Sequence, residues 1–180
     1  TIDTRCLVIS IFMCMMDVHV NRMPTGGMLF RQPAEPLRTC NLPMLFEEQS
    51  IIKRGTISKA DLRYMKPNAR VLNRVWVTIY AYRYYMVQLA DSDVSAIMPF
   101  DLRIPAAFHQ SERFSFVRWG SQTTLILPID RRYRFRTLCE ITDHVEAGKD
   151  AIVEIVPRVT ENKDDDRGRG STDEGPASSG

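Results

Sequence analysis

Residues 112–128 read ERFSFVRWGSQTTLILP, two β-rich runs separated by Gly120 and Ser121. Before the pair, Phe114 and Phe116 alternate with other residues as in a half-buried strand, and after it threonines and aliphatic residues form a second run. A glycine within a strand pattern usually marks a bend or a bulge. Glycine also permits strained backbone and close approach of a side chain, so the pair fits a self-cleavage site in which the serine hydroxyl attacks the glycine carbonyl. The dipeptide alone leaves both interpretations open.

The composition predicts one folded domain. The 180 residues are 44% hydrophobic and 26% charged, near the globular average, and the net charge of +2 is too small to predict a nucleic-acid partner. The four cysteines include no C-x-x-C pair, so we expect free thiols in a reducing compartment and no metal site. The chain starts with threonine and has no signal-peptide n-region, so we expect further sequence upstream.

Strand signals dominate the chain and predict a mainly β (α+β) fold, a single domain of antiparallel sheets with few short helices. Residues 6–13 are continuously apolar and β-branched, which predicts a buried strand. Residues 71–80 and 84–90 predict a hairpin, because both are rich in β-branched and aromatic residues. Shorter strands are expected near residues 95–100 and 145–155.

The remaining segments lack a clear periodicity. Prolines 33, 36, 43 and 67 predict a long loop over residues 31–70, broken by a short helix near residues 45–52. Residues 160–180 are charged, rich in glycine and serine and without large apolar side chains, which predicts a disordered tail. The folded domain is therefore expected to span residues 1–159.

Two short segments carry chemically suggestive side chains. In residues 17–22, DVHVNR, an extended backbone would place Asp17, His19 and Asn21 on one face, which is either a solvated strand face or a chemical site. In residues 131–136, RRYRFR, the same alternation predicts that Arg132, Arg134 and Arg136 share one face of a strand. That face fits an anionic phosphate, and it equally fits an edge strand protected by charge.

Together these segments resemble the phosphatidylserine decarboxylase family, specifically its short bacterial and archaeal branch. Residues 9–24 are similar to the family's strand and D-V-H-x-N-R-x-P signature. Residues 112–128 resemble its E-R-F-G-x-I-x-F-G-S segment, and residues 145–148 resemble the start of its closing V-x-A-G-E-T turn. The resemblance covers residues 7–157, most of the chain.

The resemblance implies a zymogen that cleaves itself between Gly120 and Ser121 into residues 1–120 and residues 121–180. Ser121 would become a covalent pyruvoyl group, the cofactor that serves as electron sink in the decarboxylation. By the same resemblance, His19 would protonate the carbanion left after loss of carbon dioxide, and Asp17 would orient or assist it. The expected catalytic residues are thus Ser121, His19 and Asp17.

The implied reaction converts phosphatidylserine, or a related serine phospholipid, to phosphatidylethanolamine and carbon dioxide. The implied location is peripheral, at the cytoplasmic face of the cell membrane. For the substrate we expect Arg132 and Arg134 to bind the phosphate and Phe46, in the long loop, to meet the acyl chains. The cleavage products would form a heterodimer, and a homo-oligomer is also expected.

Several positions depart from the family pattern. Its serine-proline pair before the signature is Cys14-Met15, and its A-G-x-x-A-R-R segment is residues 90–96, ADSDVSA, without either arginine. Gln122 follows the reactive serine where this branch usually has arginine, and an upstream aspartate-glycine motif that supports self-cleavage has no counterpart. Two other functions therefore stay open: a pyruvoyl decarboxylase of a soluble amino acid, and a non-catalytic β-rich binding module in which Ser121 stays uncleaved.

Overall fold

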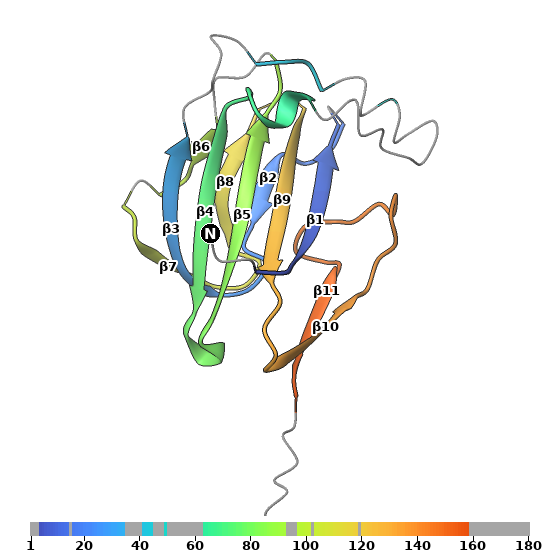
Figure 1. Ribbon diagram of the computed structural model, residues 1–180. Coiled ribbons are helices and arrows are strands. Elements are labelled where there is room, and N and C mark those ends of the chain that lie inside the picture. Colours follow the sequence, from blue (N-terminus) through green and yellow to red (C-terminus); the bar gives the residue numbers. More distant parts are fainter. Residues whose placement is uncertain are drawn as a thin grey trace, which may run out of the picture.

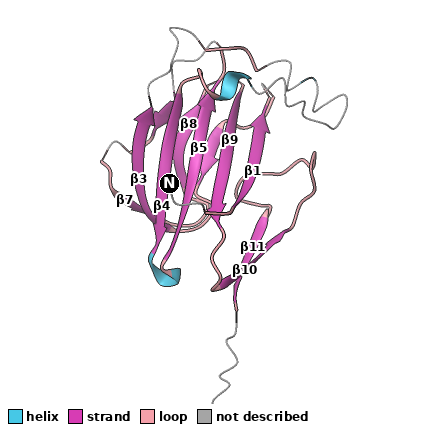
Figure 2. Cartoon of the chain, viewed as in Figure 1, coloured by secondary structure: helices cyan, strands magenta, loops and turns pink. Residues whose placement is uncertain are grey.

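The computed structural model describes residues 4–14, 16–34, 41–44, 49, 63–92, 97–101, 103–118 and 120–158. The described residues form eleven strands arranged in antiparallel sheets, and their only helical structure is short (Figure 2). The expected mainly β fold is confirmed.

The largest unit is a six-stranded sheet, seen in front in Figure 1. All neighbouring strands in it pair antiparallel. The hydrogen-bond register between them determines which side chains are neighbours on each face of the sheet. In spatial order the strands are β1 (Cys6–Met13), β9 (Ser121–Pro128), β5 (Tyr82–Ala90), β4 (Arg70–Val77), β3 (Gly27–Ala34) and β7 (Ala106–Phe108).

A three-stranded sheet lies behind the large one (Figure 1) and consists of β2 (Val20–Arg22), β8 (Arg113–Val117) and β6 (Ile97–Pro99). The apolar core includes Leu29, Val75, Tyr84 and Met86 of the large sheet and Phe114 of the small one, all nearly inaccessible to solvent. Burial of this surface is the main force that holds the two sheets face to face.

A separate hairpin, β10 (Tyr133–Thr137) and β11 (Val153–Pro157), packs on the lower end of the large sheet (Figure 1). Its inner aromatic side chains, Tyr133 and Phe135, contact Tyr82 with ring centroids 5.8 and 5.9 Å apart. Aromatic contacts at this spacing are favourable in tilted and edge-to-face arrangements. They leave the other face of the hairpin open to solvent.

The structure confirms the hairpin expected over residues 71–90, which is β4 and β5 joined by a 3-10 turn at Thr78–Tyr80. The expectation of a buried strand at residues 6–13 is wrong in part. The strand is present as β1, but it lies at the edge of the sheet, and Val8 is 56% exposed. Its apolar sequence therefore does not mean that both faces are covered.

The long irregular segment begins later than expected, because β3 continues through Pro33 to Ala34. Beyond Leu29 the strand is paired with β4 on one side only, and a proline that lacks an N–H is tolerated along such an unpaired edge. The helix expected near residues 45–52 and the tail expected at residues 160–180 fall almost entirely outside the described residues.

Candidate active site

Ser121 is the first residue of β9, at the end of the large sheet where β1 and β5 also end (Figure 1). It pairs with Met13 on one side and with Ala90 on the other, and it is completely buried. Its hydroxyl lies 4.0 Å from the thioether sulfur of Met13, a weak acceptor. The hydroxyl thus faces the space between the sheets without a strong hydrogen bond to a described residue.

Gly120 directly precedes β9 and has a left-handed backbone, with φ +48°. A Cβ at this position would lie 2.8 Å from the carboxylate oxygen Oδ2 of Asp91. Both the torsion angle and the contact require glycine here, because a side chain would be strained and would also collide. The chain therefore bends at Gly120, between β8 and β9, as one interpretation of the sequence predicts.

His19 approaches the same end of the molecule from the small sheet. Its ring is buried, and Nδ1 lies 2.8 Å from the main-chain carbonyl of Asp17. Because a carbonyl oxygen can only accept, Nδ1 carries the hydrogen and Nε2 is left to exchange a proton. Nε2 is buried and has no hydrogen-bond partner among the described residues. An unpartnered buried nitrogen is uncommon in a folded protein, which makes Nε2 a candidate for contact with a ligand or a reacting group.

Asp17 does not lie on one face with His19, as the alternation predicted. The amide of Asp17 donates to the carbonyl of Cys14 in a turn, and the strand begins only at Val20. The Asp17 carboxylate accepts the Cys14 amide at 2.7 Å and lies 3.8 Å from Nε2 of His144. Asp17 therefore orients His19 through its main-chain carbonyl, whereas its carboxylate closes the turn.

Asn21 links His19 to the strand that carries Ser121. Its amide nitrogen donates to the carbonyl of His19 at 3.3 Å and contacts the sulfur of Met13 at 3.9 Å. Its Oδ1 accepts from Thr123 of β9 at 2.7 Å. The His19 and Ser121 segments, about a hundred residues apart in sequence, thus meet through Asn21 and Met13.

A buried polar network extends from Asn21 between the two sheets. Gln88 of β5 donates to Oδ1 of Asn21 at 2.9 Å and to the hydroxyl of Ser115, and it accepts from Asn73 at 2.9 Å. All four side chains are buried. These bonds favour one arrangement of the sheets, because they are lost if the register shifts, although Oδ1 of Asn73 is buried without a partner among the described residues. The sequence pattern gave no signal for Asn73 and Gln88, since single amides in strands have no distinctive spacing.

Arg22 joins two of the segments on which the sequence resemblance rests, at residues 9–24 and 145–148. Its guanidinium donates to the carbonyl of Ser111 at 2.7 Å, and its Cδ lies 2.9 Å from the position of a Cβ on Gly148. Gly148 has φ +85°, a second position that requires glycine. The segment at residues 17–22 therefore contacts both the turn before β8 and the turn at residues 145–148.

A family model described as phosphatidylserine decarboxylase matches residues 3–153. This match spans most of the chain and contains every side chain described above. The chain belongs to the phosphatidylserine decarboxylase family. No curated protein and no solved structure matches it. Members of this family are carboxy-lyases that generally depend on a pyruvoyl group. Membership of the family therefore supports a decarboxylase-like function for the chain.

In this decarboxylase-family chain, only some of the arginines predicted to share a phosphate-binding face do so. Arg134 and Arg136 point outward from β10, but Arg132 precedes the strand and binds Asp130, with Nη2 and Oδ2 2.6 Å apart. The hydrogen bonds from Arg132 hold the pKa of Asp130 below its ordinary value. The prediction for Arg132 is wrong in its placement, because the turn before β10 includes it. Phe46 lies outside the described residues.

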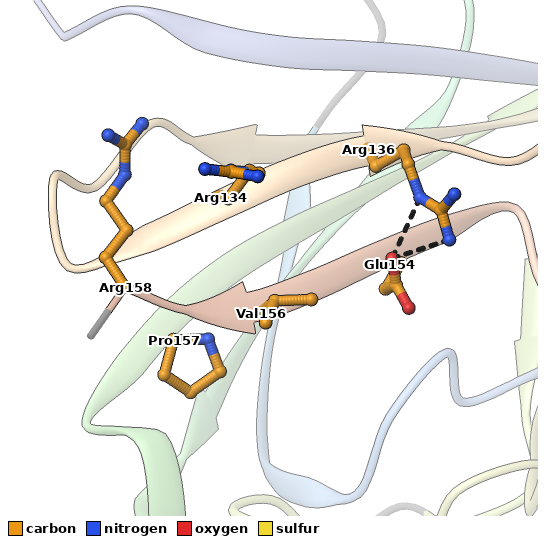
Figure 3. A pocket seen from close by; sticks show the side chains of 6 residues that line it. All are labelled: Arg134, Arg136, Glu154, Val156, Pro157 and Arg158. Carbon is orange, nitrogen blue, oxygen red and sulfur yellow. Dashed lines mark hydrogen bonds and ion pairs between the residues drawn. The ribbon is translucent and has the colours of Figure 1, made fainter.

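The open face of the β10–β11 hairpin forms a shallow groove of about 600 Å³ (Figure 3). Its lining residues are Arg134, Arg136, Glu154, Val156, Pro157 and Arg158. Glu154 pairs with Arg136 at 2.9 Å, whereas Arg134 and Arg158 have no acidic partner among the described residues. The groove therefore presents two uncompensated guanidinium groups beside an apolar floor.

Two further features bear on the chemistry. No group of three histidine, cysteine or acidic residues is arranged to hold a metal ion within the described ranges. Among the described residues, no helix has both the length and the apolar character needed to cross a membrane.

Proposed function

We propose that the protein is a pyruvoyl-dependent decarboxylase that converts phosphatidylserine, or a closely related serine phospholipid, to phosphatidylethanolamine after cleaving itself between Gly120 and Ser121. The observation that supports the proposal is that the buried Ser121, the left-handed Gly120 and the buried His19, whose Nε2 has no partner among the described residues, lie on segments that meet through Asn21 and Met13. A bend alone would need the glycine but neither the buried serine nor the histidine.

The cleavage uses atoms that the backbone already places together. The Ser121 hydroxyl bonds to the carbonyl carbon of Gly120 and the C–N bond between the residues breaks, which leaves an ester and a free amine. Loss of the Cα proton of Ser121 then breaks its Cβ–O bond and releases residues 1–120 with a new carboxylate. Water replaces the nitrogen of the remaining residue, ammonia leaves, and Ser121 has become the pyruvoyl group. The left-handed Gly120 supports the first step because it lets the hydroxyl approach the carbonyl.

The surroundings of Ser121 fit a covalent ketone. A small group at this position would lie against Met13 and Ala90 in a completely buried place, sheltered from water. When present, the pyruvoyl group supplies the electron sink that decarboxylation of an amino acid requires.

His19 supplies the proton that the reaction consumes. With Nδ1–H held by the carbonyl of Asp17, Nε2 takes up a proton from water and delivers it to the substrate carbon that has lost carbon dioxide. Asn21 fixes the backbone of His19 through its carbonyl, so the ring has one defined position.

For membrane association, we assign the groove of Arg134 and Arg158 to the negative charge of a phospholipid surface. A guanidinium offers a planar fork of donors that matches phosphate oxygens. Val156 and Pro157 add an apolar floor beside these charges. The protein would then associate peripherally with the cytoplasmic face of the membrane, as a heterodimer of its two cleavage products.

The test is an activity assay with purified cleaved protein. Vesicles that contain phosphatidylserine should yield phosphatidylethanolamine and carbon dioxide, and free serine in the same buffer should yield far less. Faster release of carbon dioxide from a soluble amino acid than from the lipid would show that the amino acid is the substrate. An uncleaved protein that releases none from either would identify a binding module.

A further inference from the structure

Asp91 lies next to the bond that is proposed to break. It follows the last residue of β5, Ala90, which pairs directly with Ser121. That strand end is fixed, because the Ala90 amide donates to the carbonyl of Ala69 at 3.0 Å and its carbonyl accepts from the side chain of Asn68 at 2.9 Å. Asp91 is therefore carried to the position opposite Gly120 by the sheet register.

The carboxylate of Asp91 packs directly on Gly120. The three atoms nearest to the position of a Cβ on Gly120 all belong to Asp91, with Oδ2 at 2.8 Å, Cβ at 3.5 Å and Cγ at 3.6 Å. The α-carbon that they cover is bonded to the carbonyl carbon under attack. No acidic side chain other than Asp91 is among these nearest atoms, and the carboxylate of Asp17 already closes its own turn.

The two oxygens of this carboxylate have different surroundings. Oδ1 accepts the amide of Met44 at 2.9 Å and also the amide of Ser92, which holds the group in one orientation. Oδ2 receives no hydrogen bond from a described residue and faces Gly120. One oxygen thus anchors the side chain, and the other is available at the scissile residue.

We propose that Asp91 is the proton carrier of self-cleavage, a proposal that rests on the proposed function. Oδ2 accepts the hydroxyl proton of Ser121 as Oγ bonds to the carbonyl carbon of Gly120. It returns this proton to the nitrogen of Ser121 as the C–N bond breaks, so that Asp91 ends in its starting state. A positioned acid or base typically contributes about a hundredfold to ten-thousandfold in rate.

The assignment separates the two stages of the reaction between two groups. His19 lies on the small-sheet side and serves the decarboxylation, whereas Asp91 lies at the end of β5 and serves the cleavage. Residues 90–96 correspond to the family's A-G-x-x-A-R-R segment, and this segment has glycine where the chain has Asp91. The carboxylate at this position is thus a departure of this chain from that pattern.

The test measures the first-order rate at which purified full-length precursor is converted to its two fragments. Asp91→Asn keeps the size and the acceptor for Met44 but cannot carry the proton, so cleavage should slow by about a hundredfold or more. Asp130→Asn is the matched control: it removes a carboxylate that accepts a main-chain amide near the opposite end of β9, and the rate should stay within about threefold of wild type.

A second variant separates proton transfer from structure. Asp91→Ala leaves a space beside Gly120, and added formate should restore part of the rate, whereas equal chloride should not. Slow cleavage without rescue by formate would overturn the proton-carrier role, and so would a wild-type rate in Asp91→Asn. A wild-type precursor that never cleaves would overturn the proposed function and this proposal with it.

Discussion

The buried end of the large sheet and the open face of the β10–β11 hairpin place polar side chains by opposite means. Around Ser121, the residues are fixed by strand register and by hydrogen bonds that cross between the sheets, as in the bond from Gln88 to Asn21. On the hairpin, Arg134 and Arg158 stand in solvent with no acidic partner in the described part of the chain. The first region suits bond breaking, which needs exact positions, and the second suits attraction to a charged surface, which does not.

The largest effect should come from Ser121→Ala, because it removes the hydroxyl that is proposed to attack Gly120. We expect complete loss of cleavage, seen as a single band on a denaturing gel beside two bands for wild type. Ser10→Ala is the control, since this serine of the neighbouring strand donates to or accepts from Thr124 away from the scissile bond. Two bands from Ser121→Ala would place the cleavage elsewhere.

His19→Ala should have the next largest effect, confined to the second stage. The expected loss in decarboxylation rate is about a hundredfold to ten-thousandfold, with cleavage largely retained, because Nε2 serves the substrate carbon. The comparison is the rate of carbon dioxide release by equal amounts of cleaved protein, with the exposed His109→Ala as control. Normal turnover by cleaved His19→Ala would remove this histidine from the mechanism.

Gln88→Leu should destabilise the fold, because it removes the buried hydrogen bonds of Gln88 to Asn73, Ser115 and Asn21. Oδ1 of Asn21 keeps a second bond, from Thr123. Each buried group left without a partner costs about 1–3 kcal/mol, so the urea midpoint should fall clearly. The exposed amide of Gln110 provides the control, since Gln110→Leu should change the midpoint little. An unchanged midpoint in Gln88→Leu would show that the network does not hold the sheets.

Charge reversal on the hairpin should have the smallest effect per residue. Attraction of a basic residue to an anionic membrane is worth about 1 kcal/mol, so Arg134→Glu with Arg158→Glu should weaken sedimentation with anionic vesicles. Raising the salt concentration should mimic the change. The control is Arg103→Glu, an exposed arginine that is already paired with Asp101. Equal binding by all three proteins would remove the groove from membrane association.

The sequence predicted most of the local features of the site. Alternating aromatics before Gly120 and β-branched residues after it indicated β8 and β9, because periodicity depends only on neighbours in the chain. The same reasoning found the β4–β5 hairpin. It also singled out His19 and Asn21, which the structure buries together.

The sequence could not predict features set by register or by where a strand begins. Asp91 reaches Gly120 only because Ala90 pairs with Ser121, a long-range pairing that no short motif encodes. Arg132 differs from Arg134 because β10 begins after it, and strand ends are the least certain part of a pattern. Asp17 was misplaced for the same reason.

The central claim is that the buried end of the sheet cleaves its own backbone. Intact-mass spectrometry of the purified full-length protein tests this claim most directly. The account predicts two chains, one that ends with Gly120 and one whose first residue has the mass of a pyruvoyl group in place of Ser121. A single chain with the full mass expected from the sequence, 20.7 kDa for these 180 residues, would contradict it.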